Sequence, residues 1–484
     1  MGRILFILSL LAVAGDGRVL NSAKHAEKNV AGEDGSVTEE QLKKVEKVDV
    51  DSESVGKMSE IDGVGSQFQE DLLDRESQVD GIARRVEKED RAGNRRKRQA
   101  WTPPNYLSKL WLGGVDYSFS PSSTKDRIYV QGEGTICISN IGKAGGQQFL
   151  TLGQGCKDLG TVAYEIGHAL GFIHTMARHD RDEYVTINFR NIKVSGRSGA
   201  MYSQNSKLFK PNSQFDKYPP EENNNYGLPY DYGSIMHYGE KSFAKKNYPT
   251  MVPRDVNYRA TMGSPFISFI DLSMMNELYK CKEKCKKEPS VTCERGGFPH
   301  PRDCKKCVCP GGYGGTRCTE RMLHQQLVSA GRLWRNTSSL FGMAKTLNTL
   351  GEHSVREDYT KCNYWIQVFS LSMLSSCCFP KFLCLFPKKN LRCRTYTSPS
   401  FQSPSDTVIE VQLAMFTRGV VVDGCELAGV EIKTNEDQTR TGYRFCSYYD
   451  RGTTLRSHSN LVPVITYNRH LRTTAILKYR YGRV

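Results

Sequence analysis

The chain has 484 residues, of which 38% are hydrophobic, so it is long enough to form several separate cores. Its formal net charge of +15 suits anionic matrix or cell-surface partners, but nucleic acid is excluded as a partner if the chain is exported. Sixteen Cys, none before Cys137 and crowded between Cys281 and Cys318, are typical of small disulfide-stapled modules in an oxidising compartment.

The N-terminal residues 1–17 are predicted to be a signal peptide. Arg3 precedes an apolar run from Ile4 to Ala14, and small residues follow, which is the order of a secretory signal. The run is shorter than the roughly 20 residues that cross a bilayer, so no transmembrane span is expected. The alternative, a buried strand or helix, has no adjacent segment to pack against. We therefore expect a secreted, extracellular protein.

Residues 18–98 are predicted to be a propeptide. They are rich in Glu, Lys, Asp, Ser and Gly, and Phe68 is their single Phe, Tyr or Trp, so they bury little apolar surface alone. The segment ends in four cations that suit the acidic cleft of a furin-like processing protease: Arg95, Arg96, Lys97 and Arg98. A nuclear-type or polyanion-binding patch is the alternative, which a preceding signal peptide disfavours.

From Trp101 to about Tyr279, aromatic residues, Gly turns and apolar runs predict the first globular core. A Cys-dense stretch follows. The remainder, from about Met322, has strand-like β-branched and aromatic character in residues 407–413 and 464–467. This order predicts three successive folded modules.

The segment from Ala163 to His174 carries the strongest chemical signal. Tyr164 and His168 lie one helical turn apart and project from one face, while Gly171 permits a turn that brings His174 to the same point. The metzincin pattern His-Glu-x-x-His-x-x-Gly-x-x-His places three imidazoles on zinc in this way, and its Glu takes a proton from water. Here Glu165 matches, but Tyr164 stands where the first His is expected. A lone buried His is more often a core residue, so further motifs are needed.

Two flanking motifs supply that specificity. Residues 177–182, Ala-Arg-His-Asp-Arg-Asp, are similar to the Ser-Arg-Pro-Asp-Arg-Asp that follows the third His in astacins. Residues 230–238, Tyr-Asp-Tyr-Gly-Ser-Ile-Met-His-Tyr, resemble the astacin Met-turn. The chain therefore resembles the astacin family of zinc metalloendopeptidases.

The resemblance implies a role for each motif residue. One Zn²⁺ per chain would be held by His168, His174 and, in place of the expected His, Tyr164. Glu165 would be the general base and then the general acid. Met236 would lie beneath the metal, and Tyr238 would be an additional ligand that swings to stabilise the oxyanion.

Two further features follow from the same resemblance. Residues 68–71, Phe-Gln-Glu-Asp, are similar to the family's Phe-x-Gly-Asp, which makes Asp71 the zinc-binding zymogen latch, although Glu70 replaces the glycine. An acidic helix start is the alternative reading of Asp71. A Cys137–Cys156 disulfide is also implied.

Three departures from the family pattern affect the expected activity. A phenol with a pKa of about 10 must lose a proton before it binds zinc, so Tyr164 predicts weaker metal binding and a strongly impaired enzyme. Thr175 replaces the Glu that anchors the new N-terminus in astacins. Between Phe119 and Ile128 much of a family helix and strand is missing, and with it the cysteine that bridges to Cys281. A mispredicted gene or a decaying paralogue is our hypothesis for this deletion together with an insertion near 368–405.

Residues 282–319 resemble an EGF-like domain because a Gly-rich turn at 310–315 precedes the last of six Cys. Six Cys admit fifteen connectivities. The resemblance implies Cys285–Cys304, Cys293–Cys307 and Cys309–Cys318. A zinc ribbon is the alternative, which the oxidising compartment disfavours.

Residues 320–484 resemble a CUB domain, with Cys425–Cys446 as the implied disulfide. An atypical insertion near 368–405 carries Cys377, Cys378, Cys384 and Cys393, and Pro380 and Lys381 make it a poor membrane span. The sequon at Asn336 is a predicted glycosylation site.

We thus predict an α+β protein: a two-subdomain astacin-like protease domain over residues 99–281, the EGF-like module and a CUB-like β-sandwich. The expected function is hydrolysis of peptide bonds in extracellular, matrix or cuticle proteins. The alternative is a catalytically impaired pseudo-protease that acts as a secreted EGF/CUB binding protein.

Overall fold

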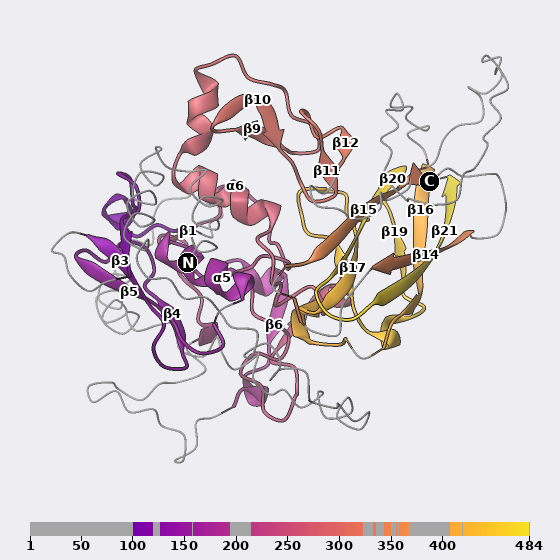
Figure 1. Cartoon of the computed structure of the whole chain (residues 1–484), viewed down its shortest axis with the longest axis horizontal. Helices are drawn as coiled ribbons and strands as arrows, with labels where there is room; N and C mark the ends of the chain where they lie inside the picture. The colour runs from indigo at the N-terminus through magenta and orange to yellow at the C-terminus, as the bar shows by residue number, and fades with distance from the viewer. Residues whose placement is uncertain are drawn as a thin grey trace, which may run out of the picture.

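The computed structural model describes residues 100–119, 126–156, 158–193, 214–322, 333–334, 343–349, 355–356, 358–367, 407–418 and 420–483. The predicted signal peptide, Asp71, the basic run 95–98, Asn336 and the insertion 368–405 lie outside these residues. Three parts follow one another along the chain: an α+β region at the left of Figure 1, a disulfide-rich segment at its top and a β-sandwich at its right. No helix among the described residues combines the length and apolarity that a membrane crossing requires.

The first part begins with a four-stranded sheet in the order β2–β3–β5–β4, formed by Tyr117–Ser118, Arg127–Gln131, Gln147–Leu152 and Cys137–Ser139. Strand β4 is antiparallel to β5, whereas β2 and β3 are parallel. Only residues 119–126 connect β2 to β3, although parallel neighbours usually need a dozen or more. This short connection agrees with the expected deletion in the same segment.

Helix α5 (Leu159–Ala169) packs its buried Val162 and Ile166 into the core that Ile128 and Leu150 of the sheet share. The helix begins at Asp158, whose carboxylate accepts a hydrogen bond from the Thr161 N–H. The Cys137–Cys156 disulfide joins β4 to the loop before α5 and matches the expected pairing.

Short strands and a second helix complete this part. Strand β1 (Ala100–Trp101) pairs with β7 (Asn223–Asn224), and β6 (Val185–Ile187) pairs with β8 (Met251–Pro253). Helix α6 (Phe269–Leu278) begins with a capping box formed by Ser268 and Asp271. Helices and mixed sheets around one core make this part the α+β fold that the sequence predicts.

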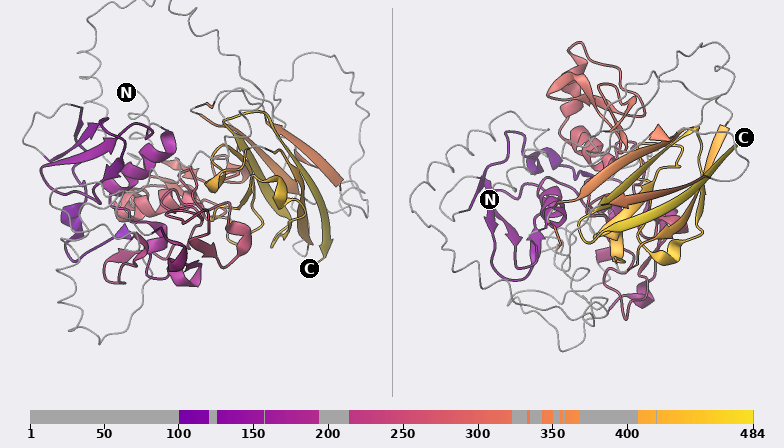
Figure 2. Two further views of the ribbon diagram at one scale, coloured as in Figure 1. Left: turned by 90° about the horizontal axis from the view of Figure 1, so that it is seen from below. Right: turned by 45° about the vertical axis from the view of Figure 1, so that its right-hand side comes forward.

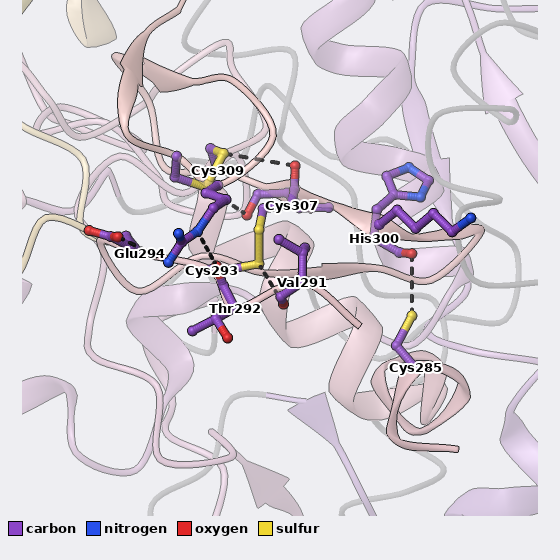
Figure 3. The surroundings of a disulfide bond; sticks show 12 residues. Cys285, Val291, Thr292, Cys293, Glu294, His300, Cys307 and Cys309 are labelled. Carbon is purple, nitrogen blue, oxygen red and sulfur yellow. Dashed lines mark hydrogen bonds and ion pairs between the residues drawn. A yellow bond between two sulfur atoms is a disulfide. The ribbon is translucent and has the colours of Figure 1, made fainter. Parts of the chain in front are cut away.

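The disulfide-rich segment starts at the 3-10 helix η11 (Cys281–Lys286) and continues with two hairpins: β9 (Phe298–His300) with β10 (Asp303–Val308), and β11 (Tyr313–Gly314) with β12 (Glu320–Arg321). Its disulfides are Cys285–Cys304, Cys293–Cys307 and Cys309–Cys318, which are the pairings expected from the resemblance. Figure 3 shows Cys293 bonded to Cys307, with Cys285 and Cys309 on either side in this view. Burial raises the pKa of the Cys281 thiol to about 11.

The C-terminal part is a sandwich of two sheets around a second core. One sheet has the order β13–β15–β20–β17–β18 (Leu333–Trp334, Thr360–Gln367, Leu461–Asn468, Ala428–Ile432, Tyr443–Phe445). The other is β14–β21–β16–β19 (Met343–Thr349, Thr473–Arg483, Thr407–Phe416, Thr454–Arg456). The strand predictions at 407–413 and 464–467 fall within β16 and β20. The Cys425–Cys446 disulfide is present.

Candidate metal and active centre

Helix α5 and the turn after it bring the motif residues to one place. The ring centroid of His168 lies 4.7 Å from that of Tyr164 and 4.8 Å from that of His174. Gly171 has φ +104°, a conformation that favours glycine, and it ends the helix so that the chain returns to His174. The sequence prediction that Tyr164, His168 and His174 meet is therefore correct in geometry.

The Met-turn lies directly beneath this helix. Met236 is fully buried, and a Cβ atom on Gly167 would lie 2.7 Å from the Met236 sulfur. A glycine at this position is therefore what permits the close packing of sulfur against helix. Tyr238 follows two residues later, its ring centroid is 4.5 Å from that of His174, and its hydroxyl donates to Gln214 Oε1 at 3.3 Å.

The hydrogen bond of His168 fixes its tautomer. Nδ1 lies 2.8 Å from the carbonyl oxygen of Phe172, and a carbonyl can only accept. The proton of the neutral ring is therefore on Nδ1, and Nε2 keeps the lone pair that a metal requires. Metal-binding His residues commonly make this kind of outer contact.

The Tyr164 hydroxyl lies 2.5 Å from His174 Nε2, and the two rings are stacked. His174 Nε2 therefore faces the Tyr164 hydroxyl and has it as a hydrogen-bond partner. Two ligands of a tetrahedral zinc ion, each about 2.0–2.1 Å from it, lie roughly 3.3 Å apart. Tyr164 and His174 must therefore separate before both can bind one ion.

Glu165 and His168 have no exposed surface, and Tyr164, His174 and Tyr238 are buried as well. The backbone carbonyl of Glu165 accepts a hydrogen bond of 2.8 Å from Ser139 Oγ, which ties α5 to β4. The described residues contain no group of three or more His, Cys, Asp or Glu side chains placed to hold a metal ion. The donor set at this centre is two imidazoles and two phenols, with one carboxylate on the same helix.

Thr175, which replaces the family's Glu, joins a polar chain under the Met-turn. Its hydroxyl donates to Ser234 Oγ at 2.9 Å, and Ser234 Oγ donates to Asp271 Oδ1 at 2.6 Å. Asp271 also accepts from the N–H of Ile235 at 2.9 Å. Burial raises the pKa of Asp271 to about 6, against the opposing effect of these hydrogen bonds.

Sequence reasoning missed Asp271 and gave His237 no role. His237 lies between the Tyr230 hydroxyl and the Tyr238 carbonyl, each 2.7 Å from one ring nitrogen, and burial lowers its pKa to about 4. The sequence Ser268-x-x-Asp271 does signal a helix start, but it contains nothing about contact with the Met-turn.

The 177–182 motif is a structural support. Arg178 makes a bidentate ion pair with Asp180, stacks over the Tyr230 ring at 5.2 Å and donates to the Pro229 carbonyl. Both charged side chains are almost fully buried. The motif thus fixes the loop that leads into the Met-turn.

The model of the astacin family, peptidase family M12A, matches residues 114–280. With the motif geometry above, this match shows that residues 114–280 form a metalloprotease domain of the astacin family.

Its relatives include zinc metalloproteinase nas-31 of Caenorhabditis elegans, 36% identical over 85% of this chain and 63% of the relative. Zinc metalloproteinase nas-32 of the same organism is 31% identical over 74% of this chain and 46% of the relative. This chain thus spans less than two thirds of the length of either protein.

A solved structure with sequence similarity is high choriolytic enzyme 1, a hatching enzyme zinc-protease from Oryzias latipes. It is 34% identical, and the match covers 33% of this chain and 71% of that chain with a TM-score of 0.27.

Proposed function

We propose that this chain is a secreted zinc metalloendopeptidase that hydrolyses peptide bonds in extracellular, matrix or cuticle proteins. The observation that carries the proposal is the convergence of Tyr164, His168, His174 and Tyr238 beside the Glu165 helix, within a family of metalloproteases. One zinc ion per chain would be held by His168 and His174 through Nε2, with Tyr164 as the third ligand.

When bound, zinc supplies a Lewis acid that polarises water and the scissile carbonyl. Glu165 takes the proton of the attacking water and passes it to the leaving amine, so that the same carboxylate serves as base and then as acid. Tyr238, released from Gln214, donates its hydroxyl to the oxyanion of the tetrahedral intermediate. Met236 would supply the apolar floor of the metal site.

The centre is weaker than that of a three-histidine enzyme. Binding costs Tyr164 its proton and its hydrogen bond to His174, so we expect low zinc occupancy and slow turnover. The test is zinc content and protein hydrolysis by the chain that begins at Gln99, with Glu165→Gln as matched control. Slow hydrolysis that Glu165→Gln abolishes supports the proposal, whereas tightly held zinc with normal turnover refutes the impairment.

A second candidate function is a secreted binding protein that uses the protease fold as a scaffold. The Tyr164–His174 hydrogen bond favours it, because the Nε2 atom that would bind the metal already has a hydrogen-bond partner. A metal-free, inert mature chain that still binds matrix supports this candidate. Activity that appears only in Tyr164→His identifies the present chain as a pseudo-protease.

The remaining features of the precursor are proposals of the same kind. Residues 1–17 would direct export, a furin-like protease would cleave after Arg98, and Asp71 would silence the zymogen. The disulfide-rich segment and the sandwich would be EGF-like and CUB-like modules, and Asn336 would carry a glycan. N-terminal sequencing and mass analysis of the secreted protein test the cleavage and the glycan directly.

A further inference from the structure

The β-sandwich contacts the protease region at the Met-turn itself. Residues 433–442, between β17 and β18, lie against the loop that begins at Tyr230, although about two hundred residues separate them in sequence. Figures 1 and 2 show the sandwich seated against the protease part.

Asp231 is the centre of this contact. Its side chain is buried, with 1% of the residue exposed, and its Oδ1 accepts from the N–H groups of Gly233 and Thr441. Its Oδ2 accepts from the Thr441 hydroxyl at 3.1 Å. A buried carboxylate requires such partners, and the sandwich supplies two of these three hydrogen bonds.

The sandwich also supplies complementary charge. Burial lowers the pKa of Lys433, and the carboxylates of Glu431 and Asp231 oppose that shift. Arg444, which pairs with Glu431 at 2.9 Å, donates to Ser264 Oγ of the protease part at 2.5 Å. Cations of one part therefore face polar and anionic groups of the other.

A row of aromatic rings crosses the same boundary. Tyr258 stacks on Tyr232 of the Met-turn loop, with ring centroids 4.2 Å apart, and its ring is tilted against that of Tyr443 of the sandwich, with centroids 4.4 Å apart. The Tyr443 hydroxyl donates to Asp255 Oδ2 at 2.8 Å. These rings continue the hydrophobic core of the protease part into the sandwich.

At several points of this contact, the backbone of one part lies too close to the other part to leave room for a Cβ atom. A Cβ atom on Gly424 of the sandwich would overlap the Gly263 carbonyl, and one on Gly233 would overlap Thr441. Gly263 and Gly424 also have positive φ, at +79° and +69°. The surfaces of the two parts are therefore complementary in shape at more than one point.

We propose that the C-terminal sandwich is a built-in support of the Met-turn, and that Thr441 is a positioning residue that holds this loop through Asp231. Its catalytic consequence rests on the proposed function, but its structural consequence does not. The protease part and the sandwich then form one cooperative unit rather than two independent modules.

The test compares hydrogen exchange of residues 228–240 in the purified chain and its Thr441→Val variant. Loss of a buried hydrogen bond to a charged group predicts about tenfold faster exchange in this segment. Thr441→Ser, which keeps the hydroxyl, is expected to restore slow exchange. Thr454→Val, at an exposed position of the same sandwich, is the matched control and is expected to leave residues 228–240 unchanged.

Tyr443→Phe provides a second, gentler variant that removes only the hydroxyl bonded to Asp255, and it is expected to speed exchange around residue 255 severalfold. If the chain hydrolyses protein, Thr441→Val should lower kcat and leave KM unchanged. Unchanged exchange at 228–240 in Thr441→Val, or separate unfolding transitions for the two parts, overturns the proposal. An inactive chain with the expected exchange pattern overturns the proposed function alone.

Discussion

Replacing Tyr164 by histidine removes the main obstacle to metal binding. A tyrosine carries its oxygen farther from the backbone than a histidine carries Nε2, by roughly the 2 Å length of a zinc–nitrogen bond. The Tyr164 hydroxyl, 2.5 Å from His174 Nε2, therefore occupies space that a metal ion needs. In Tyr164→His this space opens and a third imidazole faces it.

The expected gain in zinc affinity follows from two terms. An ordinary phenol, with a pKa of about 10, must lose a proton at pH 7, which costs about 4 kcal/mol that a neutral imidazole does not require. Breaking the Tyr164–His174 hydrogen bond adds about 1 kcal/mol. A zinc–phenolate bond recovers part of this sum, so we expect Tyr164→His to bind zinc about a thousandfold more tightly.

The assay is competition with a chelator of known affinity, together with hydrolysis of an unfolded protein substrate. Tyr164→His should hold one zinc ion per chain and cleave faster than the parent. The double variant Tyr164→His/Glu165→Gln should keep the metal and lose the cleavage, because the role proposed for Glu165 is to move the proton and not to hold the ion. Equal zinc affinity in parent and Tyr164→His would refute the reasoning.

Three further predictions concern stability. The pKa of Asp271 is raised to about 6 in the folded chain, whereas an unfolded Asp has a pKa of about 4. As pH rises through this range, the unfolded state loses its proton before the folded state does. The free energy of unfolding should therefore fall by about 3 kcal/mol between about pH 4 and above pH 6. Urea unfolding of the parent and Asp271→Asn across this range checks it, and an identical pH dependence in both would contradict it. Gly167→Ala places a Cβ against the Met236 sulfur and should lower the free energy of unfolding by about 1–3 kcal/mol. Gly132→Ala is the control and should be nearly neutral, because the nearest atom to its Cβ is 3.7 Å away. Equal melting temperatures for the two variants would be inconsistent with this packing. Arg178→Lys keeps the positive charge but loses the bidentate ion pair with Asp180 and the guanidinium that stacks over Tyr230. Thermal unfolding should therefore show a free energy of unfolding lower by about 3 kcal/mol. A decrease below about 1 kcal/mol would show that the charge alone is sufficient.

The residues around the metal centre still form an ordered set of buried contacts. Thr175, in place of the family's Glu, is integrated with Ser234 and Asp271 in a buried network. His237 bridges Tyr230 and Tyr238 within the Met-turn, and Arg178 donates to the Pro229 carbonyl that precedes it. The hydrogen bonds around the Met-turn are therefore retained, and Tyr164 is the change that bears directly on metal binding.

Local patterns were sufficient to predict the elements that carry the site. The 3.6-residue helical period predicts that Tyr164 and His168 share a face, and Gly171 predicts the turn, because both depend on neighbouring residues only. The pattern of β-branched and aromatic residues likewise predicts β16 and β20. The disulfides followed from resemblance to known modules, since Cys spacing alone leaves their pairing open.

The tertiary structure alone decided which distant groups meet. The sequence predicts that Tyr164 and His174 come to one point, but only the fold shows that the Tyr164 hydroxyl is hydrogen-bonded to His174 Nε2. Likewise, Thr441 and Asp231 are 210 positions apart, and no local pattern predicts their hydrogen bonds. Periodicity and turn chemistry act over a few residues, whereas the Thr441–Asp231 contact depends on how two separate cores pack against each other.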